Sequence, residues 1–232
     1  MKSLTLLGLG LISSVILLAQ TNPHYTVKHG TRMKDTFKYK DTYLFPSFSS
    51  GKVNFKTGDT GGGPMNYNRL TGEMDFIKSK DTLALGDPQN IKNVVIGNNL
   101  FYVQLPEGYL QLVDVIDKVI LAKREVIDLV DKRKPNNMDT FVQSSSSDGA
   151  YSNFVSGLPV SMVTKVDLVF ELRKEFYLGN EKGNFKVADK KTLIKSFPEK
   201  KVALAKYLEE HSVDFSSLES LQSAFKDIRE MK

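Results

Sequence analysis

Short apolar runs alternate with turn-forming residues through the first half of the chain. Glycine, asparagine, aspartate and proline separate the runs between residues 42 and 124, and these residue types favour turns. The spacing predicts an antiparallel β meander that forms an open barrel or a folded sheet. The clearest hairpin places Gly97-Asn98-Asn99 between two apolar runs, since Gly and Asn tolerate positive φ. The predicted strands are Thr42–Phe45, Lys52–Phe55, Met65–Tyr67, Glu73–Ile77, Thr82–Leu85, Lys92–Ile96 and Leu100–Val103.

Residues 109–130 fit two patterns. Leu112, Val115, Val119 and Val126 recur near helical spacing, but β-branched residues dominate the segment and also fit short alternating runs. Because β-branched side chains pack well in strands, extended structure is favoured. The β-rich domain is therefore predicted to span residues 40–131.

A polar segment over residues 132–164 separates this domain from the rest. It opens with Lys132–Asn137 and carries a serine run at 144–147. A segment of this length without periodicity is unusual inside a compact domain, so it predicts a flexible connection. An α+β C-terminal part is predicted to follow, over residues 165–232.

The C-terminal part begins with strands and ends with helices. Val166, Leu168, Phe170 and Leu172 alternate with polar residues, which predicts a half-buried strand. Asn180–Asn184 then predicts a turn into a returning strand at Phe185–Val187. The predicted fold class is thus α+β and mainly β, with a meander, a β-hairpin and C-terminal helices.

Start signals mark the helices. Asp189 is expected to cap the first helix, and Pro198 to open the second, where its missing N–H costs nothing. Ser216 and Glu219 have the spacing of a capping box for the last helix. The apolar stripes expected to be buried are Val202, Leu204, Ala205 and Leu208 on the second helix, and Leu218, Leu221, Phe225 and Ile228 on the last.

Residues 1–19 have the layout of a secretory signal peptide. Lys2 precedes an almost wholly apolar run from Leu4 to Leu18, and Ala19 supplies a small residue for cleavage. The run is shorter than the ~20 residues of a membrane span, and no other stretch is apolar enough to cross. We therefore expect an exported protein, periplasmic or extracellular, without a transmembrane segment in the mature chain. Residues 20–40 are polar and aperiodic, which predicts a flexible lead-in.

Composition narrows the chemistry. The chain has no cysteine, which excludes disulfides, thiol catalysis, thiolate metal sites and lipid attachment to an N-terminal cysteine. Its formal net charge is +5, and in an exported protein this suits anionic envelope material better than nucleic acid. The lysines between residues 182 and 206 are expected to form a solvated face.

No catalytic, cofactor or metal motif survives inspection. Asp59-Thr60-Gly61 matches the triplet of aspartic proteases, but those enzymes need two such carboxylates, and a second copy is absent. A glycine-rich phosphate loop would need a Lys after Gly63, where Pro64 stands instead. His24, His29 and His211 show no pairing with a nucleophile or a ligand cluster. We therefore predict no catalytic residue, no cofactor and no metal ligand.

Aromatic residues of the meander are the candidates for binding. Tyr67, Phe101, Tyr102 and Tyr109 could line a groove, although aromatic residues in strands are more often core. The absence of Trp makes a glycan site less favoured, since Trp is the best flat platform for a sugar. The predicted binding residues are Asn66, Tyr67, Asn68 and Tyr102.

Several stretches together resemble a group of secreted proteins of Bacteroidetes-type bacteria. The resemblance implies a bacterial envelope protein, supports strands over residues 109–124 and suggests an ordinary loop at the glycine run. It implies no activity and no catalytic residues. The stretches that carry it are Met65–Asn68, Gly72–Ile77, Asp81–Leu85, Val94–Tyr102, Gly149–Tyr151 and Phe197–Lys201.

Three functions remain at this point. The first is a non-enzymatic exported protein that binds an envelope or surface component, as an interaction or structural module. The second is a lipid- or glycan-binding module with its ligand in a barrel mouth or sheet cleft. The third and least favoured is a hydrolase, such as a dimeric aspartic protease built on Asp59.

Overall fold

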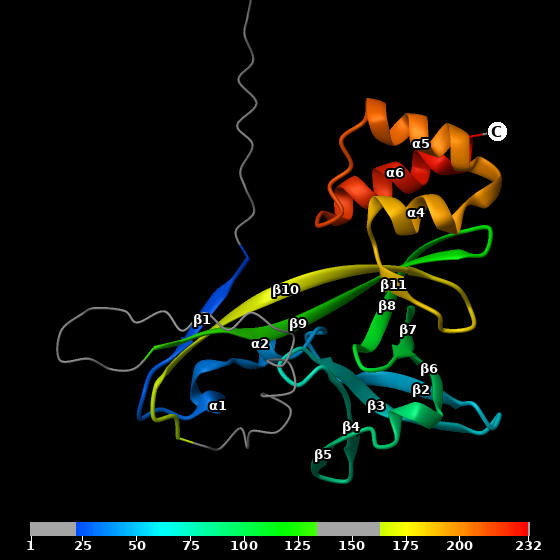
Figure 1. The fold of residues 1–232 in the computed structure, drawn as a ribbon. Coiled ribbons are helices and arrows are strands. Elements are labelled where there is room, and N and C mark those ends of the chain that lie inside the picture. The colour runs from blue at the N-terminus through cyan, green and yellow to red at the C-terminus, as the bar shows by residue number, and fades with distance from the viewer. Residues whose placement is uncertain (1–21, 134–162, 232) are drawn as a thin grey trace, which may run out of the picture.

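The computed structural model describes residues 22–133 and 163–231, which form one antiparallel, open sheet of eleven strands (Figure 1). The strand order is β1-β10-β9-β8-β7-β6-β2-β3-β4-β5, and β11 also pairs with β10. The predicted α+β, mainly β class is confirmed. The strands are β1 (His24–Val27), β2 (Ser49–Phe55), β3 (Thr60–Asn68), β4 (Glu73–Lys78), β5 (Asp81–Ala84), β6 (Ile91–Ile96), β7 (Asn99–Gln104), β8 (Gly108–Ile116), β9 (Val119–Arg133), β10 (Asp167–Gly179) and β11 (Lys186–Val187).

The helices are short and lie mainly after the last strand. Figure 1 shows α4, α5 and α6 together at one end of the long β9–β10 ribbon, with β1 toward its other end. The helices are α1 (Met33–Thr36), α2 (Tyr39–Thr42), α4 (Lys190–Ser196), α5 (Lys201–Glu210) and α6 (Leu218–Glu230), with 3₁₀ helices η1 (Pro88–Asn90) and η2 (Pro198–Lys200).

The predicted meander is present, with one exception. The runs that begin at Lys52, Met65, Glu73, Thr82, Lys92 and Leu100 all fall in strands β2 to β7. The predicted strand at Thr42–Phe45 is wrong: α2 ends at Thr42, and Tyr43 makes only an isolated bridge to Asn68. Instead of a ladder of its own, the segment after α2 has two backbone hydrogen bonds, from Leu44 N–H to the Tyr67 oxygen and from Arg69 N–H to the Thr42 oxygen, and it is also held by the Asn66 side chain.

The expected loop at the glycine run is also wrong, because Gly61–Gly63 lie within strand β3. They pair with β2 in a register that sets Gly63 opposite Gly51 and Gly62 opposite Lys52. A Cβ on Gly62 would lie 3.1 Å from the Gly51 carbonyl oxygen, and one on Gly51 would lie 2.7 Å from Met65 Sδ. Gly51 and Gly62 therefore permit the close approach of the two strands, and of the triplet Asp59-Thr60-Gly61 only Asp59 lies in the turn before β3.

Residues 109–130 are extended, as favoured from their β-branched content. They form β8 and most of β9, which pair with each other and continue the meander. Strand β9 then pairs with β10 along the whole length of β10, from Asp167 opposite Arg133 to Gly179 opposite Ile120. The predicted connection at 132–164 lies mostly outside the described residues, and the strands that flank it are neighbours in one sheet.

The predicted lead-in at residues 20–40 carries regular structure from His24 onward, which corrects that expectation. Strand β1 pairs with β10, and Val27 and Met33 are fully buried against Phe170 and Leu172. The strand has four residues, which is too short for a clear alternating pattern, and for this reason the sequence did not indicate it. Its partner, β10, is distant in sequence. The predicted signal peptide at residues 1–19 lies outside the described residues.

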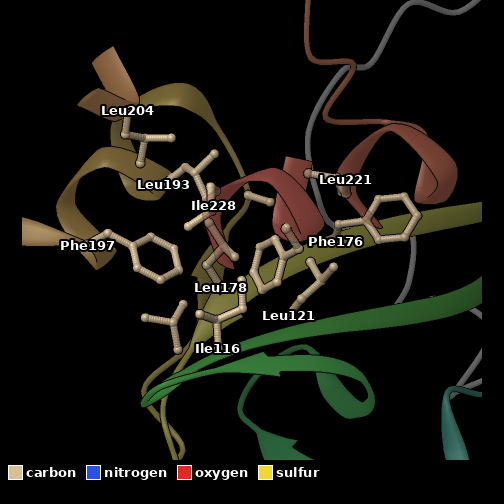
Figure 2. Packing of buried hydrophobic residues seen from close by; sticks show 12 residues of the cluster. Ile116, Leu121, Phe176, Leu178, Leu193, Phe197, Leu204, Leu221 and Ile228 are labelled. Atoms are coloured by element: carbon tan, nitrogen blue, oxygen red, sulfur yellow. The ribbon is translucent and has the colours of Figure 1, made fainter. Parts of the chain in front are cut away.

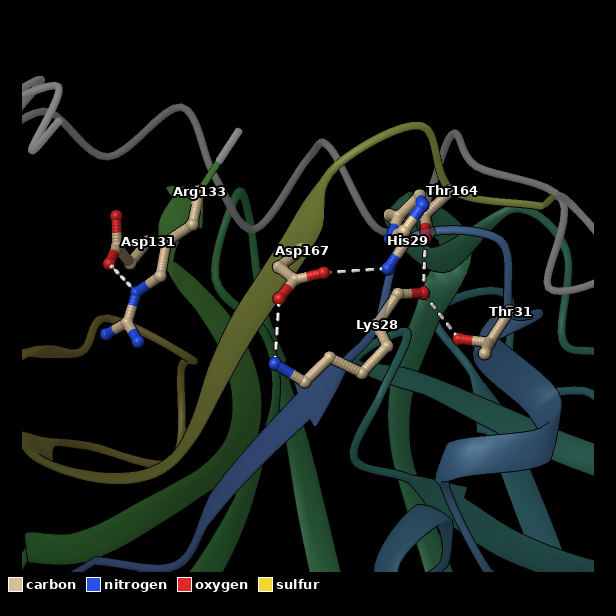
Figure 3. A network of polar contacts seen from close by, with 7 residues as sticks. All are labelled: Lys28, His29, Thr31, Asp131, Arg133, Thr164 and Asp167. Atoms are coloured by element: carbon tan, nitrogen blue, oxygen red, sulfur yellow. Dashed lines mark hydrogen bonds and ion pairs between the residues drawn. The ribbon is translucent and has the colours of Figure 1, made fainter. Parts of the chain in front are cut away.

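Asp167 fastens the end of β1 to the start of β10 (Figure 3). Its Oδ1 accepts a hydrogen bond from the His29 backbone N–H, and its Oδ2 accepts one from Lys28 Nζ, both at 2.8 Å. The Lys28 carbonyl oxygen in turn accepts from Thr31 Oγ1 at 2.6 Å and Thr164 Oγ1 at 2.9 Å. The hydrogen bonds from Lys28 and His29 lower the pKa of Asp167.

We expect Asp167→Asn to lower the free energy of unfolding by about 1 kcal/mol at neutral pH. A carboxyl whose folded pKa lies below its unfolded value, about 3.9, stabilises the fold above that value and loses the contribution as pH falls through the folded pKa. The difference between variant and wild type should therefore shrink below about pH 4. Urea unfolding of both proteins across this range measures it, and a difference that stays constant with pH would contradict the assignment.

A cluster of buried side chains joins the helices to the ribbon (Figure 2). Leu193, Phe197, Leu204, Phe225 and Ile228 are all fully buried. They pack on Ile116 of β8, Leu121 of β9, and Phe176 and Leu178 of β10. The predicted buried face of the last helix is confirmed for Leu221, Phe225 and Ile228, and Leu218 packs on its margin.

Two details of the helices differ from expectation. Val202 is 84 % exposed, because it lies two residues from buried Leu204 and so faces the other side of α5. The cap of α6 is Ser217, whose Oγ accepts from the Ser220 N–H at 3.3 Å, since the Ser216 hydroxyl donates to Asp214 at 2.6 Å. The cap expected at Asp189 is confirmed, whereas Pro198 opens the 3₁₀ helix η2, which leads directly into α5 at Lys201.

Candidate functional site

A surface pocket of about 350 Å³ forms where four turns and strand ends meet. These are the β2–β3 turn, η1, the end of β7 and the β10–β11 turn, so the pocket joins segments that are far apart in the sequence. Its lining residues are Lys56, Pro88, Gln89, Val103, Gln104, Leu105, Gly183, Asn184, Phe185 and Lys186.

The lining combines two cations, three side-chain amides and an apolar surface. Lys56 and Lys186 are exposed, and neither forms a salt bridge within the described part of the chain. Gln104 is oriented by its Oε1, which accepts from the Phe185 N–H at 3.2 Å. The pocket therefore offers positive charge and hydrogen-bonding amides beside an aromatic ring.

Phe185 is the buried member of the lining, and a glycine sets its position. Its ring packs against Tyr102 with centroids 5.3 Å apart. A Cβ on Gly179 would lie 2.4 Å from the Phe185 ring and 2.7 Å from the Asn184 carbonyl oxygen. Glycine at the end of β10 thus lets the β10–β11 turn fold back over the strand and bring Phe185 to the pocket.

A second polar grouping lies inside the folded sheet, and we call it the interior polar cluster. Tyr67 comes from β3, Arg124 and Asp128 from β9, and Glu175 from β10. Arg124 Nη1 donates to Glu175 Oε2 at 3.0 Å, and the Tyr177 hydroxyl donates to the same oxygen at 2.9 Å. The cluster consists of Tyr67, Glu107, Tyr109, Arg124, Asp128 and Glu175.

Burial dominates the electrostatics of this cluster. It raises the pKa of Tyr67 and of Tyr109 well above the ordinary value for a phenol, and the positive charge of Arg124 only partly opposes this at Tyr67. Burial also raises the pKa of the Asp128 carboxyl, again against Arg124. The guanidinium of Arg124 thus acts on Tyr67, Asp128 and Glu175 in common, and Arg173 adds a second positive charge that acts on Asp128.

The structure uses two of the predicted binding residues to hold the fold. Asn66 is fully buried, and its amide bonds both backbone groups of Phe45, at 3.0 Å and 2.9 Å. Asn68 donates to Asp75 Oδ2 at 3.0 Å and accepts from the backbone N–H groups of Leu70 and Thr71. These asparagines fasten the segment after α2 and shape the β3–β4 turn.

The two predicted tyrosines lie in different places. Tyr67 is 2 % exposed, packs on Phe101 and contributes its hydroxyl to the interior polar cluster. Tyr102 belongs to a separate group of side chains, where it supports Phe185 beside the pocket. The four predicted residues therefore do not form one groove.

Other candidate residues stand apart from both sites. Asp59 is exposed in the β2–β3 turn, and its carboxylate accepts from Thr57 Oγ1 at 2.8 Å, which is a turn-forming contact. His211 ends α5 and stacks on Tyr207. Within residues 22–133 and 163–231, no group of three or more His, Cys, Asp or Glu residues could hold a metal ion.

Comparisons with protein-family models, with curated proteins and with solved structures found no match for this chain. Of the helices that the structure describes, none has both the length and the apolar character needed to cross a membrane.

Sequence reasoning missed both groupings for different reasons. The pocket is built from turns, whose polar residues look like ordinary surface along the sequence. The interior polar cluster had one visible signal, since Arg124 and Asp128 interrupt the apolar residues of β9. Charged residues in a strand that is buried on both sides need partners, and this points to an internal polar site.

Proposed function

We propose that this protein is an exported bacterial envelope protein that acts by binding rather than catalysis, and that its surface pocket takes an acidic glycan. The observation that supports this best is the pocket lining, which sets Lys56 and Lys186 beside the amides of Gln89, Gln104 and Asn184. Lysine attracts carboxylate or sulfate groups, and amides exchange hydrogen bonds with sugar hydroxyls.

The apolar part of the lining suits a sugar better than a lipid chain. Val103, Leu105 and Phe185 provide a limited apolar surface, and most of the rim is polar and exposed. Lipid chains require deep cavities with predominantly apolar walls. A pyranose ring instead stacks one face on a small apolar surface while its hydroxyls reach the rim.

The same lining favours binding without chemistry. It contains no carboxylate, histidine, serine or tyrosine, and its two lysines are exposed rather than desolvated, so neither has the surroundings of a catalytic base or nucleophile. The leader-like residues 1–19 and the resemblance to secreted proteins of Bacteroidetes-type bacteria motivate the proposed location. Acidic polysaccharides are exposed at such surfaces, where an exported module would meet them.

Calorimetric titration of the mature protein with a polyuronate hexasaccharide tests the proposal, with maltohexaose as the neutral comparison. We expect the polyuronate to bind more tightly than maltohexaose and its affinity to fall as salt is added, because surface charges are screened. Lys56→Gln with Lys186→Gln should weaken polyuronate binding by about tenfold or more.

Lys201→Gln with Lys226→Gln is the matched control, since it removes the same charge from exposed positions on α5 and α6. If both double variants lose affinity equally, only net charge matters and the pocket is not the site. If the protein binds neither sugar, the proposal fails.

A further inference from the structure

The segment that runs from the β10–β11 turn into the helices is strongly basic. Between Glu181 and Lys206 there are eight lysines and three carboxylates, so this stretch holds as much net charge as the whole chain, which is +5. Elsewhere along the sequence the positive and negative charges cancel. Of the three carboxylates, Asp189 is already engaged in the fold, since it accepts a hydrogen bond from the Thr192 N–H as the cap of α4.

Lys186 connects the surface pocket to this basic segment. It lines the pocket and begins β11, and α4 starts after only two further residues beyond that strand. Strand β11 pairs with β10 alone, so it lies at an edge of the sheet. Figure 1 shows the chain passing from the β10–β11 turn through β11 into α4. The pocket and α4 are therefore neighbours along this edge.

Three lysines lie on the outer side of α4. Leu193 is fully buried in the cluster that covers β10, whereas Lys190, Lys191 and Lys195 are exposed. Lys191 and Lys195 are four positions apart and Lys190 adjoins them, so the helix sets all three on one side. None of them forms a salt bridge within residues 22–133 and 163–231. The outer side of α4 thus presents three ammonium groups to solvent.

The charges on the opposite side of the pocket are mixed. Asp59 lies in the β2–β3 turn and Asp87 at the start of η1, and both are exposed. Lys56 and Lys92, from the same turn and from the strand after η1, balance them. A polyanion that leaves the pocket is therefore attracted toward α4 more strongly than across η1.

The pocket is also too small to enclose a long glycan. Its volume of about 350 Å³ is near the lower end of the range for ligand pockets. Its lining comes from turns and strand ends at the surface, so a bound chain can continue beyond it. The units that leave the pocket must then lie on the neighbouring surface.

We infer that the ligand of the pocket is a long acidic polysaccharide, which continues from Lys186 along the outer side of α4. This inference rests on the proposed function and adds the class of glycan, a polymer with negative charges on successive units. Those charges meet Lys190, Lys191 and Lys195 in turn. Each such contact on an exposed surface is weak, so binding strengthens with chain length because several contacts form at once.

Polyuronate chains of three and of twelve units separate the pocket from its extension, and calorimetric titration of the mature protein measures the binding of each. We expect the twelve-unit chain to bind more tightly. The combined variant Lys190→Gln, Lys191→Gln and Lys195→Gln should weaken binding of the twelve-unit chain by about tenfold. It should leave binding of the three-unit chain unchanged, whereas Lys56→Gln with Lys186→Gln should weaken binding of both chains.

The matched control is Lys34→Gln with Lys38→Gln and Lys40→Gln, which removes three charges from exposed positions at α1 and α2, away from α4 (Figure 1). It should bind both chains as wild type does. The inference is overturned, and the pocket stands, if both triple variants lose the same affinity for the twelve-unit chain or if the α4 variant loses none. It is also overturned if the pocket variant leaves the twelve-unit chain unaffected. If neither chain binds, the proposed function fails together with it.

Discussion

Replacing Phe225 with alanine is expected to lower the free energy of unfolding by about 3–5 kcal/mol. Phe225 is fully buried in α6, and its ring meets that of Phe197 edge-on with centroids 6.2 Å apart. It belongs to the cluster that holds α4, α5 and α6 on β8, β9 and β10, so the lost ring leaves a cavity at the centre of that interface. Chemical denaturation followed by circular dichroism measures the change.

Val202→Ala is the matched control on the same group of helices. Its side chain is 84 % exposed, so the substitution should change the free energy of unfolding by no more than about 0.5 kcal/mol. A loss below about 1 kcal/mol for Phe225→Ala would show that the helices do not share a core with the ribbon.

Replacing Arg124 with methionine should cost about 2–4 kcal/mol, because it removes the counter-charge of a buried grouping. The variant leaves Glu175 without its bond at 3.0 Å and removes the cation that lowers the pKa of the mostly buried Asp128 carboxyl most, with only Arg173 still opposing the effect of burial there. The partial exposure of Glu175 places the expected cost at the lower end for a buried pair. Urea unfolding at neutral pH measures this loss.

A double-mutant cycle separates the pair from the packing of the long side chain. Glu175→Gln in the Arg124→Met background should recover part of the loss, since the second change removes a carboxylate that has lost its partner. Additive costs for the two substitutions would contradict the coupling. Lys123→Met serves as the comparison, because Lys123 directly precedes Arg124 in β9 and bonds Glu125 instead.

The parts of the fold that follow from local pattern could be predicted from the sequence. Leu168, Phe170 and Leu172 of β10 pack into one cluster as their spacing indicates, with Val166 just before the strand against it, and Gly97 adopts the positive φ expected in its hairpin. β-branched content correctly favoured strands over residues 109–130. These features depend on neighbours a few positions away, which is why the sequence reveals them.

Features that depend on distant partners could not be predicted in this way. Gly61–Gly63 suggested a loop, but they lie in β3, where Gly62 approaches the Gly51 carbonyl oxygen of β2 closely and Gly51 leaves room for Met65. Strand β1 is defined by its pairing with β10, and the local sequence of residues 24–27 shows little of it.

The residues of the candidate sites also depend on partners that are distant in the sequence. Tyr67 was predicted to be a binding residue, but the fold buries its ring. Its hydroxyl is also buried and belongs to the interior polar cluster. Lys56 and Lys186 stand far apart in the sequence and come together only because the β10–β11 turn folds toward η1. No local pattern could have joined them.

The pairing of β1 with β10 has a consequence for how the chain is made. Lys28 and Asp167 are 139 positions apart, so most of the polypeptide must emerge before the first strand can find its place. Until then the edge of β1 offers unpaired backbone groups to any other extended chain. Pairing between residues so distant in sequence forms slowly. Because the chain is synthesised from its N-terminus, β1 is made early and stays unpaired until β10 has been made. Folding of this protein should therefore be sensitive to whatever shields its N-terminal segment during synthesis.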